Sequence, residues 1–159
     1  MQYSVIKEAL DRDFTLVKDS QVEGLGVFAK RNIPKGSRII EYKGERISKK
    51  DLILDMVKGL TSLKYVMNLT ETIAIDGERN GNEARFINHS CEPNCTVYYF
   101  DDKPFIYALR EISEGEELSF DYQLVTENPE QVIDFEQKKA MFPCQCGSVK
   151  CRGTLFSID

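Results

Sequence analysis

Along the first 122 residues, apolar side chains occur in short runs rich in Val, Ile, Tyr, Phe and Thr, and Gly, Pro, Asn and Asp separate these runs. Runs of this length and composition, bounded by turn-forming residues, predict β-strands. Tight turns are predicted at 34–36 and 113–115, where a Pro or Ser stands two residues before a Gly. The candidate strands are 14–17, 26–29, 38–42, 65–69, 72–75, 96–100, 105–109 and 117–122.

Two segments carry helix signals instead. Ser48 can cap a helix over 49–57, which Gly59 would end. Asn128 can cap a second helix over 129–140, with a proline at its first position and a glutamine where a capping box needs one. Strands outnumber helices and do not alternate with them, so the pattern predicts a mainly β fold and argues against a doubly wound parallel sheet.

The length of 159 residues and the hydrophobic fraction of 42% predict one domain with a short appendage. The net charge of -5 is unevenly divided, because residues 1–63 carry 12 basic and 9 acidic side chains while residues 64–159 carry 9 and 17. This acidic half argues against a nucleic-acid face and would suit a basic peptide, although a solvated acidic surface is the simpler explanation. We expect no membrane span and no secretory signal, since the chain lacks a long apolar run and a basic segment before one.

Three of the five cysteines, Cys144, Cys146 and Cys151, are crowded into one short segment. Such a cluster cannot join distant parts of a fold by disulfides, and metal ligation is the better interpretation. A structural zinc ion takes four Cys or His ligands in a tetrahedron, so a fourth must come from elsewhere, either Cys91 or Cys95. The alternative is a set of buried, inert thiols, which seldom cluster among Gly, Ser and Lys.

The run 85–94, RFINHSCEPN, contains the only histidine of the chain, His89, directly after Asn88. Taken alone, His89 could be a base or a metal ligand. The run 117–122, ELSFDY, alternates as a strand end does, and its aromatic residues could simply be core and rim side chains. The GLG at 24–26 lacks the third glycine of a dinucleotide-binding loop, so a tight turn is its commoner meaning.

Together these motifs resemble SET-domain protein lysine methyltransferases, most closely the trithorax-like and histone H3-methylating branches. The resemblance covers residues 14–156, nearly the whole chain, and its last part is similar to the zinc-binding post-SET segment. The motifs that carry it, in chain order, are GLGVFAKRNIPKG, EYKGE, YVMNL, IDGERNGNEARFINHSCEPN, ALREISEGEELSFDY and CQCGSVKCRGTL.

The resemblance implies a SET-domain, β-clip-like fold of several small sheets with few short helices. It divides the chain into an N-terminal flank (1–13), a SET domain (14–122) with a variable insert (45–65), a partly helical connector (123–143) and a post-SET zinc segment (144–159). The RFINHS run and the strand ending at Tyr122 are expected to thread together as a pseudoknot, an exception to the rule that chains rarely thread.

The cofactor that the resemblance implies is S-adenosylmethionine. The glycine loop and Phe28 would contact its methionine side, Asn88 and His89 its adenine and amino-acid groups, and Leu155 would cover the adenine. The residues assigned to cofactor binding are Gly24, Leu25, Gly26, Phe28, Tyr65, Arg85, Asn88, His89, Tyr122 and Leu155.

The resemblance also implies the catalytic and metal-binding residues. Tyr122 would be the central catalytic residue, and the side chains of Tyr42, Tyr65 and Phe120 would line a lysine channel. In the family, Phe at the position of Phe120 leaves room for further methyl groups, whereas Tyr restricts the product to monomethyl-lysine, so di- or trimethylation is expected. The implied ligands of a structural zinc ion are Cys91, Cys144, Cys146 and Cys151, which leaves Cys95 spare.

The implied activity is methylation of a lysine in a basic protein or peptide, foremost a histone H3-type tail. A non-histone substrate is the second hypothesis, and a catalytically silent SET module that only binds a peptide is the third. A eukaryotic or host-directed protein of this kind would act in the nucleus or on chromatin, and any other in the cytoplasm. No direct nucleic-acid site and no membrane contact are expected.

Overall fold

The computed structural model describes residues 13–125, 130 and 132–157. Short strands dominate, as the sequence predicts, and the described residues form four small sheets. The elements in chain order are β1 Thr15–Asp19, β2 Leu25–Ala29, β3 Arg38–Glu41, β4 Glu45–Ser48, α2 Lys49–Val57, β5 Val66–Asn68, β6 Ile73–Asp76, the 3₁₀ helix η1 Glu83–Phe86, β7 Asn88–His89, β8 Cys95–Phe100, β9 Lys103–Ala108, β10 Ser119–Phe120 and α3 Phe135–Met141.

Three of the sheets are antiparallel, namely the β1–β2 hairpin, the sheet β3-β9-β8 and the sheet β4-β6-β5. The fourth is the parallel pair of β7 and β10. In β9, Pro104, Ile106 and Ala108 are buried while the alternate residues are more exposed, which is the period of two expected for a sheet with one buried face.

The core lies where the sheets meet and consists mainly of aliphatic side chains. Val27 of β2, Ile106 of β9 and Leu118, just before β10, are each 0% exposed. Ile33 and Ile112 directly precede the two predicted turns, and each donates its backbone N–H to the other's carbonyl, at 2.8 and 2.9 Å. The mainly β prediction is therefore confirmed, and the core ties β2, β9 and the segment just before β10 into one body.

The first predicted helix is confirmed with its boundaries. The Ser48 side chain accepts a hydrogen bond from the Asp51 backbone N–H at 3.1 Å, which satisfies one of the free donors at the helix start. Gly59 follows the helix with a φ of 75°, a conformation that glycine adopts at little cost. Only Leu52 of α2 is buried, so most apolar side chains of this helix are exposed.

The second helix was predicted over 129–140, and the predicted start is wrong. Helix α3 begins at Phe135, because Asp134 and Gln137 form a complete capping box: Gln137 N–H donates to Asp134 Oδ1 at 2.8 Å, and Asp134 N–H donates to Gln137 Oε1 at 3.1 Å. The cap predicted at Asn128, with Pro129 and Gln131 after it, lies outside the described residues. None of the described helices is long and apolar enough to cross a membrane.

Two strands, β4 and β7, had no counterpart among the predicted strands. β4 has the polar sequence ERIS, and it forms because β6 offers an antiparallel partner from Ile73 to Asp76. β7 consists of Asn88 and His89 within the RFINHS run, and it pairs with β10 in parallel. The two segments expected to thread together therefore lie side by side.

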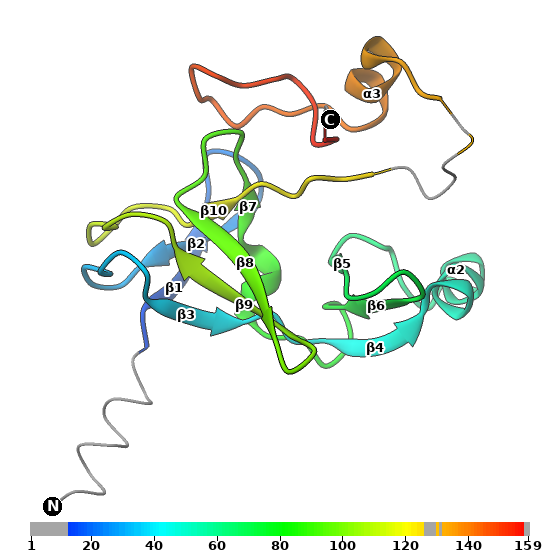
Figure 1. The fold of residues 1–159 in the computed structure, drawn as a ribbon, viewed down its shortest axis with the longest axis horizontal. Helices are drawn as coiled ribbons and strands as arrows, with labels where there is room; N and C mark the ends of the chain where they lie inside the picture. Colours follow the sequence, from blue (N-terminus) through cyan, green and yellow to red (C-terminus); the bar gives the residue numbers. More distant parts are fainter. Residues whose placement is uncertain (1–12, 126–129, 131, 158–159) are drawn as a thin grey trace, which may run out of the picture.

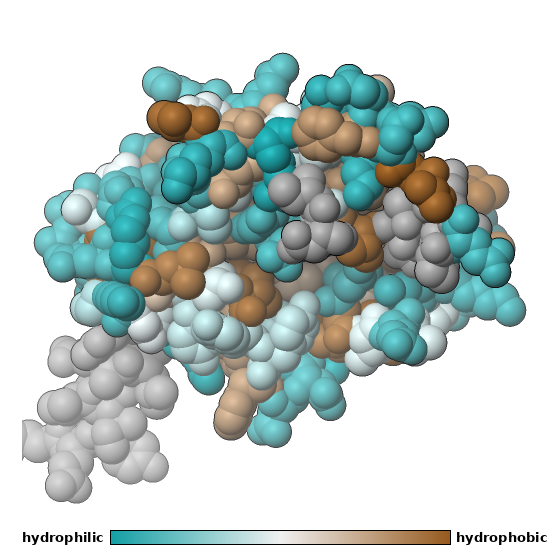
Figure 2. Space-filling view, turned by 45° about the horizontal axis from the view of Figure 1, so that its top comes forward, coloured by the Kyte–Doolittle hydropathy of each residue, from teal (hydrophilic) through white to brown (hydrophobic). Residues whose placement is uncertain are grey.

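Figure 1 shows how these parts are arranged. The C-terminal segment, residues 132–157, runs along the top of this view, from α3 on the right to the loop above β7 and β10, and α2 lies with β4, β5 and β6 on the right. On the face seen in Figure 2, apolar residues appear as separate patches among hydrophilic ones. The described part of the predicted post-SET segment, residues 144–157, and helix α3 of the predicted connector both belong to this C-terminal segment.

Replacing Leu118 by Ala tests this core. Leu118 is 0% exposed, so the substitution should leave a cavity and lower the free energy of unfolding by about 2–5 kcal/mol. Leu60 is 59% exposed, and Leu60→Ala is the matched control, with an expected change below about 0.5 kcal/mol. Urea denaturation of both variants measures the difference, and equal losses would contradict the assigned core.

Candidate active site

The parallel pairing of β7 with β10 brings the two sequence motifs together. Asn88 pairs with Ser119 and His89 with Phe120, and Ser90 N–H donates to the Phe120 carbonyl at 3.2 Å. The pair is short, and the Asn94 side chain reinforces it by accepting from Ser119 N–H at 2.9 Å. Polar side chains from the first motif therefore meet the aromatic side chains of the second.

His89 lies between the aromatic residues and the cysteines. Its Nδ1 accepts a hydrogen bond from Tyr122 N–H at 3.0 Å, and its Nε2 lies 3.4 Å from Cys91 Sγ. Burial lowers the pKa of His89 to about 4, although the Asp121 carboxylate works in the opposite direction. The neutral ring must then carry its proton on Nε2, from which it donates to Cys91. His89 positions its neighbours and is not free to act as a base.

Tyr122 is held by both its hydroxyl and its ring. The hydroxyl donates to the Ile87 carbonyl at 2.5 Å, and the ring centroid lies 4.9 Å from that of Phe120 and 5.3 Å from that of His89. Burial raises the pKa of Tyr122 well above its ordinary value, and the nearby negative charge of Glu23 and Glu117 adds to the shift. Tyr122 is therefore a neutral phenol at physiological pH.

Asn88 is fixed by a network that the sequence analysis did not identify. Its Nδ2 donates to Glu117 Oε1 at 2.9 Å and to the Glu23 and Leu25 carbonyls at 3.2 and 3.1 Å. Because acceptors surround the amide nitrogen, the amide oxygen points away from them and can accept a hydrogen bond from a ligand. Ser20 Oγ donates to the same carboxylate at 2.7 Å.

The network around Asn88 leaves no room for a side chain at Gly26. A Cβ atom at residue 26 would collide with the Glu117 carboxylate, so a larger residue would displace the group that orients Asn88. The only sequence signal for Glu117 was its place at the start of ELSFDY. Its acceptor role depends on contacts that join β2 to the start of β10, and these follow from the fold.

A cavity of about 460 Å³ opens between this network and the C-terminal segment. Its size is within the range of small-molecule sites. Among the residues predicted to bind a cofactor, Asn88, His89, Tyr122 and Leu155 line it. The remaining lining residues are Val22, Glu23, Met141, Phe142, Pro143, Cys144, Gln145 and Cys146.

The other residues predicted to bind the cofactor do not line this cavity. The 24–26 loop follows directly on the lining residues Val22 and Glu23. The ring of Phe28 faces Lys18, whose Nζ is 4.2 Å from its centroid. The structure therefore brings the glycine loop close to the cavity and does not bring Phe28 there.

Tyr42, Tyr65 and Arg85 form a group of contacting side chains near Tyr122. The Tyr42 hydroxyl donates to the Tyr65 carbonyl at 2.8 Å, and the Arg85 guanidinium lies 5.6 Å from the Tyr65 ring centroid. Burial raises the pKa of Tyr42, with Asp76 adding to the shift. The Tyr42 hydroxyl therefore ties the Tyr42 side chain to the backbone at Tyr65.

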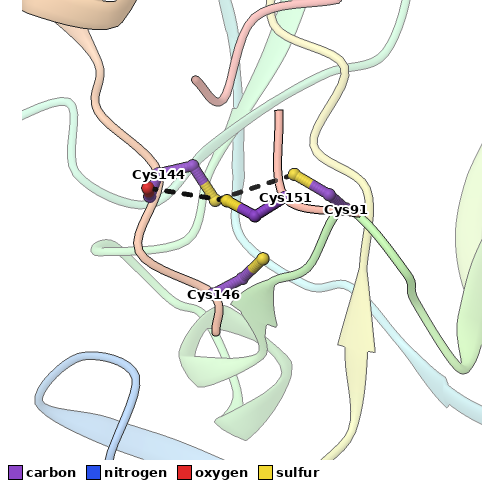
Figure 3. Close-up of side chains that lie close together, drawn as sticks. All are labelled: Cys91, Cys144, Cys146 and Cys151. Atoms are coloured by element: carbon purple, nitrogen blue, oxygen red, sulfur yellow. Dashed lines mark hydrogen bonds between the residues drawn. The ribbon is translucent and has the colours of Figure 1, made fainter. Parts of the chain in front are cut away.

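Four cysteines converge at the far side of the cavity. The Sγ atoms of Cys91, Cys144, Cys146 and Cys151 all lie within 4.8 Å of one another. Figure 3 shows that one side chain comes from the β7 side and three come from the C-terminal segment. Cys95 lies elsewhere, 1% exposed in the core, where burial raises its pKa to about 12. Of the two candidates for a fourth ligand, the structure brings Cys91 to the cluster.

The spacing of the cluster is compatible with a tetrahedral zinc site. A zinc–sulfur distance of about 2.3 Å requires sulfur atoms about 3.8 Å apart. Cys91 Sγ and Cys144 Sγ are 3.8 Å apart. Arg152 N–H also donates to Cys91 Sγ at 3.4 Å, as donors commonly do around metal-bound thiolates.

The C-terminal segment is further attached by an ion pair that the sequence analysis missed. The Arg152 guanidinium donates to both carboxylate oxygens of Asp121, at 2.7 and 2.8 Å. Burial opposes the charge on Asp121, but the hydrogen bonds from Arg152 outweigh it and hold the pKa of that carboxyl below its ordinary value. Both residues stood within recognised motifs, yet neither motif indicated that the two would meet.

Comparison with known proteins agrees with this arrangement. Residues 24–123 match the SET domain family. The chain is 36% identical to histone-lysine N-methyltransferase trithorax of Drosophila virilis over 96% of its length, and 36% identical to the H3 lysine-4 specific histone-lysine N-methyltransferase of Schizosaccharomyces pombe over 86%. It spans only 4% and 14% of these relatives. Because the family match covers residues 24–123 and these identities extend over most of the chain, the chain belongs to the SET-domain family.

Proposed function

We propose that the protein is an S-adenosylmethionine-dependent protein lysine N-methyltransferase that acts on a histone tail of the H3 type. The observation that carries the proposal is one cavity lined by Asn88, His89, Tyr122 and Leu155, in a chain of the SET-domain family. The relatives named as histone-lysine N-methyltransferases support the choice of a histone substrate.

The cavity fits a cofactor that carries positive charge. The Asn88 amide oxygen is a free acceptor for an ammonium group, because its amide nitrogen already has protein partners. Glu23 adds a carboxylate at the rim, and Leu155 adds an apolar surface suited to an adenine ring. When bound, S-adenosylmethionine would supply an electrophilic methyl group on a sulfonium, and these residues would hold it.

The chain's own part in the reaction is to accept the lysine amine in its neutral form and to align it. A free lysine has a pKa of about 10.4, and a desolvated site near a positive charge lowers that value. Tyr122 stays protonated, so it would orient the amine through its hydroxyl oxygen and would not accept a proton from the lysine ammonium group. That proton would leave to solvent. Alignment within about 3–3.5 Å then supplies most of the remaining rate enhancement.

The aromatic residues near Tyr122 would form the channel for the substrate lysine. The Phe120 ring lies against Tyr122, and Tyr42 fixes Tyr65 through its carbonyl. Aromatic faces attract a methylated ammonium group, which favours substrates that already carry one methyl group. Phe120 has no hydroxyl to hold a water molecule beside the amine, so we propose di- or trimethylation.

We also propose that Cys91, Cys144, Cys146 and Cys151 hold one structural zinc ion. Four thiolates close the coordination shell and leave no position for a substrate, so the ion would have no part in the methyl transfer. Its role would be to fasten the cysteine-rich loop beside the cavity. A histone substrate implies action on chromatin, and a non-histone substrate or a silent peptide-binding module are the alternatives.

The activity is tested by incubating the protein with methyl-labelled S-adenosylmethionine and core histones. We expect labelled histone H3, and Tyr122→Phe should reduce the turnover rate about 100-fold, because the amine loses its alignment. Tyr98→Phe is the control, since Tyr98 is 59% exposed on β8 and should not affect the rate. Label only on other proteins would support the non-histone alternative, and peptide binding without label would support the silent module.

The number of methyl groups is tested by mass spectrometry of a methylated peptide after exhaustive turnover. The wild-type protein should give di- or trimethyl-lysine. Phe120→Tyr adds a hydroxyl beside Tyr122 and should shift the product toward monomethyl-lysine. A wild-type protein that stops at monomethyl-lysine would contradict the proposed role of Phe120.

The zinc site is tested by metal analysis of purified variants. Cys91→Ser removes one ligand and should abolish the expected one zinc per chain, whereas Cys95→Ser removes a core thiol and should leave the zinc content unchanged. Retention of zinc in Cys91→Ser together with its loss in Cys95→Ser would show that the ligand set is wrong.

A further inference from the structure

The C-terminal segment is attached to the body at two places. One is the cysteine cluster, to which this segment contributes residues between Cys144 and Cys151. The other is Arg152, which directly follows the last cysteine and bonds to Asp121. Asp121 immediately precedes Tyr122, so the second attachment lies next to the proposed catalytic residue.

The Asp121–Arg152 pair has the geometry of a strong, specific contact. Both guanidinium Nη atoms engage the carboxylate, one oxygen each, and the two side chains are only 22% and 14% exposed. A bidentate arginine–carboxylate pair fixes orientation as well as distance. A lysine offers a single point charge and cannot reproduce this arrangement.

The same guanidinium also binds the chain that lines the cavity. Arg152 Nε donates to the Phe156 carbonyl at 2.9 Å, and Nη2 donates to the Leu155 carbonyl at 3.3 Å. One planar group therefore connects the residue before Tyr122 to the backbone of Leu155. Tyr122 and Leu155 line the same cavity, so the pair sets the distance between two of its walls.

Backbone hydrogen bonds continue this attachment after Arg152. Leu124 N–H donates to the Leu155 carbonyl at 3.2 Å, and Ser157 N–H donates to the Leu124 carbonyl at 2.8 Å. Phe156 is 4% exposed and packs against Phe142, with ring centroids 5.3 Å apart. The bonds of Leu124 use no sulfur atom and join residues 155–157 directly to the body. Nearer the cluster, Arg152 N–H also donates to Cys91 Sγ, and Cys144 N–H donates to the Gly153 carbonyl at 3.0 Å.

We propose that Asp121 and Arg152 are positioning residues that hold Leu155 on the cofactor cavity independently of the cysteine cluster. This rests on the proposed cofactor site, because the pair would act on the cofactor only through Leu155. Zinc would order the loop between Cys144 and Cys151, while the Asp121–Arg152 pair would order residues 152–157. Loss of the pair should then weaken cofactor binding without loss of metal.

The test compares Arg152→Lys with Arg110→Lys in the full chain. Arg110 also bonds to both oxygens of a carboxylate, that of Glu116, at 3.2 and 3.0 Å, but this pair is exposed and is not part of the cavity lining. Arg152→Lys should raise the Kd and KM for S-adenosylmethionine about tenfold, with kcat changed less than about twofold. The zinc content should stay at the wild-type value, and Arg110→Lys should change none of these quantities.

Amide hydrogen exchange, measured without cofactor, tests the attachment itself. Arg152→Lys should accelerate exchange at Leu124 and Ser157, whereas chelation of the wild-type protein should accelerate exchange in 144–151 and leave those two amides protected. Asp121→Asn, which keeps the size of the side chain, should act in the same direction as Arg152→Lys if the lysine variant folds poorly.

Three results would overturn the proposal. They are unchanged exchange at Leu124 and Ser157 in both variants, loss of their protection on chelation alone, and a fall in kcat with no change in Kd. Failure of the wild-type protein to bind S-adenosylmethionine would instead contradict the proposed function. The exchange measurement would still decide in that case whether the pair fastens the segment.

Discussion

The short parallel pair of β7 and β10 is the contact on which the rest of the site depends. It joins Asn88 and His89 to Ser119 and Phe120, which are separated in sequence by the whole β8–β9 hairpin. Two residue pairs would be too few to hold parallel strands alone. Side chains supply the remainder, since Tyr122 binds both the His89 ring and the Ile87 carbonyl, and Asn94 binds the backbone on the β10 side.

The C-terminal segment is attached to the body directly after each of these two strands. Cys91 lies two residues after β7, and Asp121 lies one residue after β10, so each strand ends next to an attachment point. His89 connects the two because its ring accepts from Tyr122 N–H and donates to Cys91 Sγ. A change at either attachment can therefore reach Tyr122 through one or two hydrogen bonds. The cavity exists only where body and segment meet.

Local sequence predicted the elements that depend on neighbouring residues. The helix at 49–57 was found because Ser48 and Gly59 act within one turn of its ends, and most strands were found because their apolar residues pack on a common core. The polar strand β4 and the two-residue strand β7 were not predicted, because each forms only by pairing with a strand that is distant in the sequence. The start of α3 was misplaced because the sequence analysis put the cap at Asn128, whereas the reciprocal bonds of Asp134 and Gln137 fix the observed start.

The sequence alone determined the family, the mainly β class and three of the four clustered cysteines, because these follow from residue types at short spacing. The tertiary structure decided between Cys91 and Cys95, since only one of these thiols reaches the cluster while the other is buried in the core. It also decided that Glu117 orients Asn88 and that Arg152 binds Asp121. Such pairings depend on which strands become neighbours, and that is set by the packing of the whole chain and by no local pattern.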